Sequence, residues 1–147
     1  ARAALGWCSP VIDQAVLADF ISEGHFTRHI RRMRSIYAER QSALISALSR
    51  NVDGLLEVKP AAAGIHLTCS LPDQFDDKAV AREAAAHGVV VLPLSAFQVG
   101  EAELPSSGLV LGYGAYSVRQ IKEGASKLAA ALKTVARIPK NREAHRR

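Results

Sequence analysis

The sequence has few cysteines, no long apolar run and no signal-like start, and each of these absences argues against a class of protein. Two cysteines, Cys8 and Cys69, are too few for a disulfide scaffold or a zinc site, which favours a reducing cytoplasm. No apolar run approaches the ~20 residues that span a bilayer, and the start, ARAALGWCSP, lacks the basic-then-apolar layout of a secretory signal. With 48% hydrophobic and 22% charged residues among 147, the composition is that of one ordinary globular domain.

Two further features indicate a piece cut from a longer protein. The chain has no Met at position 1 and opens in mid-pattern. The first predicted helix, which begins at Ser9-Pro10 and ends at Gly24, carries apolar residues on several sides. The later elements cannot cover all of them, so we expect a missing neighbour that buries this helix.

No catalytic or nucleotide-binding motif is present. The sequence contains no P-loop, no G-x-G-x-x-G after a strand, no G-x-S-x-G and no H-E-x-x-H. Gly112-Tyr113-Gly114 is a lone fragment of a glycine-rich loop, and a strand end that needs backbone freedom is the favoured interpretation. The residues alone therefore predict an α/β domain and no reaction.

The five histidines do not form a set of metal ligands. His25 and His29 lie one helical turn apart and could clamp a metal, but no carboxylate or cysteine joins them at matching spacing, so a surface pair is favoured. His66 alternates with apolar neighbours on a predicted strand and therefore faces either solvent or a cleft. His87 precedes a helix-ending glycine, where the helix dipole favours an imidazole.

The net charge of +5 is concentrated in two stretches. Residues 25–50 hold six arginines against one acid, and residues 133–147 hold six bases against one acid. The rest of the chain holds 7 bases and 12 acids and is therefore acidic. This distribution favours a solvated helix face and a basic tail. A DNA-contacting patch is the alternative, although few aromatic residues are interleaved with the bases.

Hydrophobic periodicity and turn residues predict eight elements in the order α-α-β-β-α-β-β-α. The second helix spans about 26–48, with apolar residues three and four apart on one face. Asp76 or Asp77 caps the third helix, and the capping-box pair Ser117 and Gln120 begins the last one. The predicted strands are 55–59, 65–71, 89–92 and 109–112. The third of these strands is expected to be buried, because it is β-branched.

The strand-helix-strand unit from Ile65 to Leu92 predicts the architecture. Such a unit favours an open sheet with helices packed mainly on one face. The predicted fold class is therefore α/β, with a long helix before the sheet. A loop rich in Pro, Ser and Gly is expected over 93–108, and Pro139 ends regular structure.

A long segment of the second helix resembles a known family. Phe20–Arg40, F-I-S-E-G-H-F-T-R-H-I-R-R-M-R-S-I-Y-A-E-R, closely resembles a stretch of the MocR-type regulators. These are GntR-related bacterial transcription factors whose effector module is similar to a fold-type-I, pyridoxal-phosphate-dependent aminotransferase. Three later segments follow in the family's order, and the resemblance covers about residues 10–132. They are Ala62–Leu67 (A-A-G-I-H-L), His87–Phe97 (H-G-V-V-V-L-P-L-S-A-F) and Leu109–Gly114 (L-V-L-G-Y-G).

The resemblance implies a domain organisation. Residues 1–24 would be the terminal helix of a large cofactor domain, 25–50 a long connector helix, 51–136 the C-terminal small domain and 137–147 a basic flexible tail. The family's Schiff-base lysine and its DNA-binding winged helix-turn-helix would then lie upstream of this chain. On this interpretation the segment alone is not catalytic, binds no cofactor covalently and holds no metal.

The resemblance also implies a cofactor and partners. Pyridoxal 5'-phosphate is expected in the full-length protein, together with a homodimer, a small amino-containing effector, and DNA bound through a domain absent from this chain. The candidate residues of the effector cleft are Gly64, His66, Ser95 and Phe97. Many aminotransferases carry an arginine that binds the substrate carboxylate, on the strand that matches residues 109–112 of this sequence. Val110 stands at that position here. Either the carboxylate is bound elsewhere or the ligand differs.

Two alternatives remain open. One is a fragment of a genuine pyridoxal-phosphate-dependent aminotransferase, which a winged helix-turn-helix upstream would exclude. The other is a stand-alone small α/β ligand-binding or interaction domain. Such a domain would be a cooperatively unfolding monomer without an exposed apolar patch, whereas an excised piece would aggregate or bind a hydrophobic dye.

Overall fold

The computed structural model describes residues 10–52, 54–98 and 107–137. The chain forms two compact units, divided between Ile36 and Tyr37, so the boundary falls inside helix α2 (His25–Asn51). We describe each unit by itself. The predicted cap Ser9, the cysteine Cys8, the tail 138–147 and part of the loop 93–108 lie outside the described residues.

The first unit contains helix α1 (Val11–Ser22) and the first three turns of α2. Gly24, at φ 77°, makes the turn between the two helices, a left-handed conformation that favours glycine. No residue of α1 is buried, although the helix is rich in large apolar side chains. The exposed ones are Val11, Ile12, Val16, Leu17, Phe20 and Ile21. This confirms the prediction of a helix with apolar residues on several sides.

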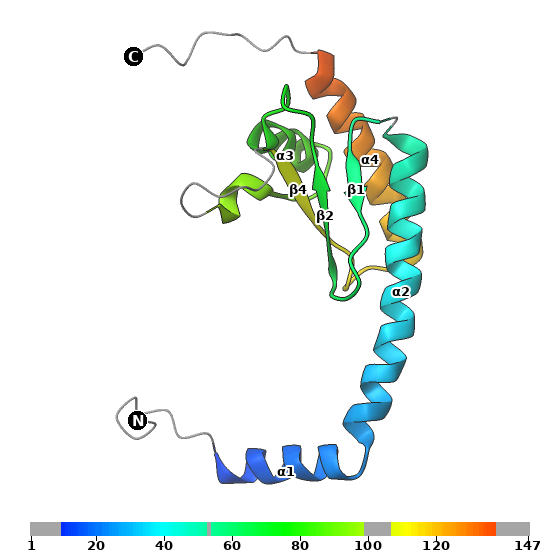
Figure 1. Cartoon of the computed structure of the whole chain (residues 1–147), viewed down its shortest axis with the longest axis vertical. Coiled ribbons are helices and arrows are strands. Elements are labelled where there is room, and N and C mark those ends of the chain that lie inside the picture. Colours follow the sequence, from blue (N-terminus) through cyan, green and yellow to red (C-terminus); the bar gives the residue numbers. More distant parts are fainter. Residues whose placement is uncertain (1–9, 53, 99–106, 138–147) are drawn as a thin grey trace, which may run out of the picture. The chain divides into compact units, whose positions relative to one another are not determined.

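The second unit is built on a four-stranded open sheet (Figure 1). The strands β1 (Glu57–Lys59), β2 (His66–Ser70), β3 (Leu92–Pro93) and β4 (Gly108–Gly112) lie in the order β1-β2-β4-β3. Every neighbouring pair is antiparallel, so β2 and β3 run in the same direction with β4 between them. His66 lies opposite Gly112, and Leu92 lies opposite Val110. The strand-helix-strand unit is thus split by a third strand.

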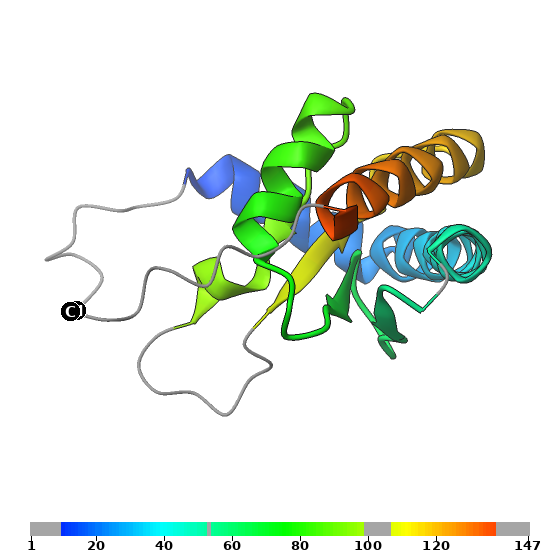
Figure 2. The same ribbon diagram turned by 90° about the horizontal axis from the view of Figure 1, so that it is seen from above.

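Helices cover one face of this sheet, as predicted. The C-terminal half of α2, α3 (Asp77–Ala86) and α4 (Val118–Arg137) pack with the same alternate strand residues into one core. Figure 2 shows α3 and α4 together on one side of the strands. The largest completely buried side chains are Leu48, Leu67, Cys69, Val80, Leu109, Tyr113 and Leu132. Because strand side chains alternate between the two faces of a sheet, the strand residues that alternate with the buried ones point away from the helices.

Local signals predicted the starts of α3 and α4 correctly. Asp76 caps α3, since its Oδ1 accepts a hydrogen bond from the Lys78 backbone N–H at 3.0 Å. Before α4, the Ser117 N–H donates to Gln120 Oε1 at 3.0 Å, and the Gln120 N–H donates to Ser117 Oγ at 3.4 Å. This is the predicted reciprocal capping box.

Three predicted strands are shorter than expected, and the second, predicted over 65–71, loses one residue at each end. The third was predicted as a buried strand over 89–92, but the ladder contains only Leu92 and Pro93, and Val90 is 85% exposed. The Val89 N–H donates to Ala84 O at 2.9 Å, so this part of the chain completes the end of α3 and joins the sheet only at Leu92. The first strand begins at Glu57, not 55, because the Leu55 N–H closes a turn onto Val52 O.

Among the described residues, no helix has the length and apolar content that crossing a membrane requires.

Candidate functional site

The face of the sheet opposite the helices, which we call the open face, carries the first two predicted cleft positions. Its side chains follow from the strand alternation: Glu57, Lys59, His66, Thr68, Ser70, Leu92 and Val110. His66 and Thr68 are exposed, Leu92 is 46% exposed and Val110 is half-buried. Since the helices of the second unit pack on the other face, the open face presents an imidazole, a hydroxyl and aliphatic groups side by side.

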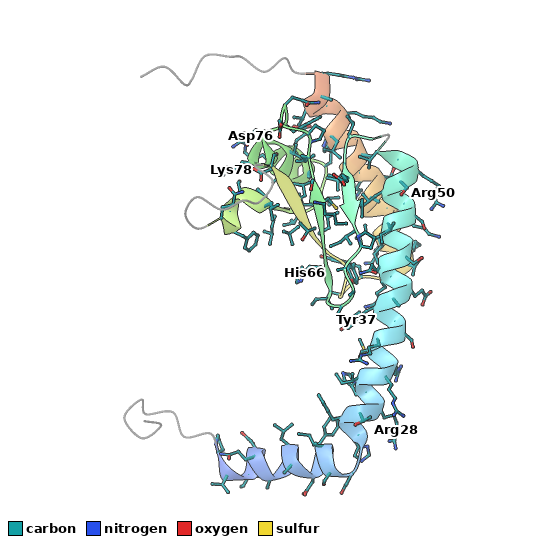
Figure 3. All side chains as sticks on the ribbon, in the orientation of Figure 1. Arg28, Tyr37, Arg50, His66, Asp76 and Lys78 are labelled. Atoms are coloured by element: carbon teal, nitrogen blue, oxygen red, sulfur yellow. The ribbon has the colours of Figure 1, made fainter. Side chains whose placement is uncertain are left out.

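Gly64 and His66 lie where the chain enters β2, and Tyr113 fixes this approach (Figure 3 labels His66). The buried Tyr113 hydroxyl donates to Gly64 O at 2.9 Å, and the Tyr113 N–H donates to Ile65 O at 3.0 Å. Gln41 Nε2 lies 3.2 Å from the same hydroxyl and 2.9 Å from Ala61 O, and it donates to both. Gly64 itself has φ +105°, which a residue with a side chain adopts only under strain. The approach to His66 is therefore held by α2 and by the end of β4.

Close packing adds to this anchor at Gly114. A Cβ atom on Gly114 would lie 2.9 Å from the Cβ of Ile65, so only glycine fits beside that side chain. Arg40, from α2, donates a hydrogen bond from Nη1 to Gly114 O. The Gly112-Tyr113-Gly114 fragment is thus a strand end, as favoured from the sequence. Close packing, not backbone freedom, requires the glycine at 114, since neither Gly112 nor Gly114 has a positive φ. The fragment also ties β4 to α2.

Ser95 and Phe97 lie on a short 3-10 turn, η2 (Leu94–Phe97), and the buried carboxylate of Asp77 holds that turn. Asp77 Oδ1 accepts from Ser95 Oγ at 2.7 Å, and Oδ2 accepts from the Ser95 N–H at 2.8 Å and the Gly108 N–H at 3.4 Å. Because the Ser95 hydroxyl proton is engaged by Asp77, its oxygen can meet a ligand only as an acceptor. Phe97 is 55% exposed, so its ring is the accessible group of this turn.

The structure places the four candidates in two groups at opposite ends of β4. His66 pairs with Gly112, whereas the turn that holds Ser95 joins Gly108 through Asp77. Four residues of strand separate these ends, which corresponds to about 14 Å. Between them lies Val110, opposite Thr68 and Leu92. The four residues therefore do not form one tight constellation.

Reasoning from sequence missed Asp77 and Tyr113 as anchors of these two groups. Asp77 was considered only as a helix cap, and its partner Ser95 lies 18 residues away, a separation that no local rule connects. Tyr113, flanked by two glycines, carried a weak signal of close approach but none for its hydrogen bond to Gly64. Both contacts depend on tertiary structure.

A cavity of about 300 Å³ lies on the helix side of the sheet, within the second unit. It is bounded by the segment 88–91, the end of β4 and the first half of α4, with Glu123 and Lys127 among its charged residues. None of Gly64, His66, Ser95 or Phe97 lines it. The cavity is therefore separate from the predicted cleft residues.

The remaining titratable groups of the described residues show no catalytic arrangement. Burial raises the pKa of the Cys69 thiol from its ordinary value of 9.0 to about 12, so this cysteine is a neutral core residue. His25 Nε2 lies 3.2 Å from Glu23 Oε2 on the exposed surface, as expected for a surface histidine. Within the described part of the chain, no group of three or more His, Cys, Asp or Glu side chains could hold a metal ion.

By themselves, the described residues do not fit pyridoxal phosphate, which is the cofactor that the resemblance implies. That cofactor needs a lysine held in an enclosed site. The described lysines are all exposed: Lys59, Lys78, Lys122, Lys127 and Lys133.

Comparisons with known proteins give the relationship of the chain. No family model matches it. It is 37% identical over 118 residues to the probable rhizopine catabolism regulatory protein MocR of Rhizobium meliloti, covering 80% of this chain and 24% of that protein. It is 31% identical over 118 residues to the uncharacterised HTH-type transcriptional regulator YhdI of Bacillus subtilis (strain 168), covering 80% of this chain and 25% of the relative.

The solved structures give the fold. The α-aminoadipate aminotransferase LysN of Thermus thermophilus, complexed with N-(5'-phosphopyridoxyl)-L-leucine, matches with a TM-score of 0.77 and 25% identity. The match covers 86% of this chain and 32% of that one, and the chain spans about a quarter of the length of the regulators above. The chain is therefore similar in sequence to one segment of the MocR-type transcriptional regulators, and it has the fold of part of a fold-type-I aminotransferase.

Proposed function

We propose that this chain is the C-terminal part of the aminotransferase-like effector domain of a pyridoxal-phosphate-dependent transcription regulator. One observation carries the proposal: the sequence matches HTH-type regulators over 80% of its length, while its fold is that of an aminotransferase. A protein with both relationships senses a ligand with an enzyme-like module and acts through a separate DNA-binding domain. That domain and the cofactor lysine lie, in this proposal, upstream of the chain.

The exposed apolar side chains of α1 support the upstream domain. A helix that is apolar on all sides is stable in water only when other protein covers it. In the proposed organisation residues 1–24 end the large cofactor domain, 25–50 connect it to the small domain of residues 51–136, and 137–147 form a basic tail. The large domain would then cover α1.

In this proposal the open face forms one wall of the effector cleft. His66 and Thr68 supply hydrogen-bonding groups from β2, and Phe97 supplies an apolar edge from η2. Asp77 and Tyr113 hold these groups in place without reaching the ligand. An effector that contacts this wall and the large domain together would favour a closed arrangement, and that shift in population would be transmitted through the dimer to the DNA-binding domains.

Val110 bears on the class of effector. It stands at the centre of the open face, half-buried between Thr68 and Leu92, where the resemblance places a carboxylate-binding arginine. An aliphatic side chain cannot donate the two parallel hydrogen bonds with which a guanidinium group binds a carboxylate. We therefore propose that this strand does not hold an effector carboxylate, and that the amino group and the apolar part of the effector are what the wall recognises.

The test uses the full-length protein and pyridoxal phosphate. Titration with the cofactor is expected to give a visible absorption band, and reduction with borohydride should fix the cofactor to one lysine. Peptide mass spectrometry is expected to locate that lysine outside the 147 residues. Absence of the band, or labelling of one of the lysines described above, would contradict the proposal.

The same preparation separates the regulator from its alternative. A regulator is expected to retard a duplex that carries the promoter region of its own gene. Turnover of an amino acid and a 2-oxo acid without any retention of DNA would instead favour a genuine aminotransferase. That alternative keeps some support from the LysN match, which is 25% identical.

A further inference from the structure

One face of the first three turns of α2 is densely cationic. Phe26, Ile30 and Met33, spaced by four and three residues, lie on the apolar side of the helix. Arg28, Arg31 and Arg32 project from the opposite side, and we call these three residues the arginine face. All three are exposed, and Figure 3 shows Arg28 projecting from the helix.

The arginine face has almost no neutralising partner. Residues 25–36 contain four arginines, two histidines and no acid. Arg28 Nη1 lies 3.3 Å from His25 Nδ1, and that histidine contacts Glu23. Within the described part of the chain, Arg31 and Arg32 form no ion pair. The charge on this surface is therefore largely uncompensated.

Two physical arguments indicate what such a face contacts. Burying an unpaired guanidinium against protein is costly, whereas the apolar side with Phe26 gains from burial. When other protein covers α2, its apolar side is therefore the one that is covered, and the arginines stay outward. A guanidinium group also donates two parallel hydrogen bonds to phosphate oxygens, a planar geometry that the ammonium group of lysine lacks.

We propose that the arginine face binds the phosphate backbone of duplex DNA, as an auxiliary contact that reads no sequence. The inference rests on the proposed function, because the HTH-type relatives supply the reason to choose DNA as the partner. Arg28 to Arg32 span about 6 Å of helix. Duplex DNA presents one negative charge per about 1.7 Å of its axis, so the three guanidinium groups can engage two or three phosphates at once.

The experiment measures DNA binding by the full-length protein as a function of salt. Fluorescence anisotropy would be recorded with two labelled duplexes of equal length, one from the promoter region of its own gene and one of scrambled sequence. The test variant is R28Q/R31Q/R32Q. The matched control is K122Q/K133Q/R137Q, which removes three exposed charges from α4 and leaves the arginine face intact.

The arginine-face variant is expected to bind both duplexes more weakly by the same factor. Its plot of log affinity against log salt should be shallower by about 1.8 to 2.7, which is two or three contacts at about 0.9 each. The control variant should keep the slope of the unchanged protein. Circular dichroism and the thermal midpoint of both variants should stay the same, since all six side chains are exposed.

Three results would overturn the inference. An unchanged salt slope in R28Q/R31Q/R32Q shows that no phosphate is bound there, and an equal loss in the control shows an effect of net charge alone. A loss confined to the promoter duplex shows base recognition instead of backbone binding. If the unchanged protein binds neither duplex, the proposed function fails as well, which distinguishes that outcome from the other three.

Discussion

Two neighbouring aspartates show how differently one residue type acts at adjacent positions. Asp76 is exposed and caps α3 with one hydrogen bond, whereas Asp77 is 3% exposed and accepts three. We expect Asp77→Ala to lower the free energy of unfolding by about 3 kcal/mol, because it leaves the half-buried Ser95 donors and the buried Gly108 N–H without an acceptor. Asp76→Ala is expected to cost only about 1 kcal/mol, the usual value of a lost N-cap.

Urea denaturation followed by circular dichroism measures both changes. The pair is its own control, since the two substitutions delete the same group at consecutive positions. A loss of equal size in both variants would show that Asp77 acts only through the start of α3. Asp77→Asn should recover part of the stability, because its amide oxygen can accept one of the three bonds while its NH₂ group faces donors.

The same pair of aspartates shows how far the role of a single residue can be predicted from the sequence. Both aspartates have the residue type and position of a helix cap, so either one was a sound prediction, and Asp76 fills that role. Asp77 instead accepts hydrogen bonds from Ser95 and Gly108, which reach it only after the sheet has formed. Candidate residues such as His66 could be identified by alternation along a strand, but their separation from Ser95 depends on the register of β2 with β4.

At the scale of elements, the segment that leads into β2 owes its conformation to a distant tyrosine. The Tyr113 hydroxyl donates to Gly64 O and accepts from Gln41 Nε2. We expect Tyr113→Phe to destabilise the fold by about 1–2 kcal/mol, because it removes both bonds without creating a large cavity. Hydrogen exchange should show faster exchange at the amides of residues 61–65 and little change in α3.

A Gln41→Leu variant provides the comparison, since it removes the bonds from Gln41 to Ala61 O and to the Tyr113 hydroxyl and leaves the bond from Tyr113 to Gly64 O in place. Protection at residues 61–65 that is unaffected by Tyr113→Phe would show that backbone pairing alone holds this segment.

Element ends and element pairing were predictable to different degrees. The capping box at Ser117 and Gln120 is encoded within four residues, and it begins α4 as predicted. The run Val89–Leu92 has the composition of a buried strand, yet Val90 is 85% exposed, because the end of α3 holds Val89. A run of β-branched residues favours an extended backbone, but it does not show whether a neighbouring strand pairs with it.

At the scale of the whole molecule, the two units expose very different surfaces. No residue of α1 is buried, whereas the second unit contains a continuous core. We expect the 147-residue chain alone to bind a hydrophobic dye and to self-associate, because contiguous exposed apolar surface of this kind drives association. The variant V11Q/I12Q/V16Q/L17Q should lose most of both properties, as measured by dye fluorescence and sedimentation.

Val90→Gln is the control, since Val90 is more exposed than any of the four substituted α1 residues but lies in the second unit. It should leave self-association nearly unchanged. Equal dye binding by the chain and by the α1 variant would show that the apolar surface lies elsewhere, and it would remove one support of the proposed upstream domain. Cooperative unfolding of the second unit should persist in both variants.

The register of β2 with β4 also constrains how the chain folds during synthesis. Residue 66 pairs with residue 112, and among the described strands β4 alone joins β3 to the rest of the sheet. When the ribosome has released the chain only as far as residue 100, it has therefore exposed β2 with one short partner, β1, and a free edge on its other side. Translation must carry β4 out of the exit tunnel before the second unit can close, so the nascent chain is open to chaperones or to wrong pairing during that interval.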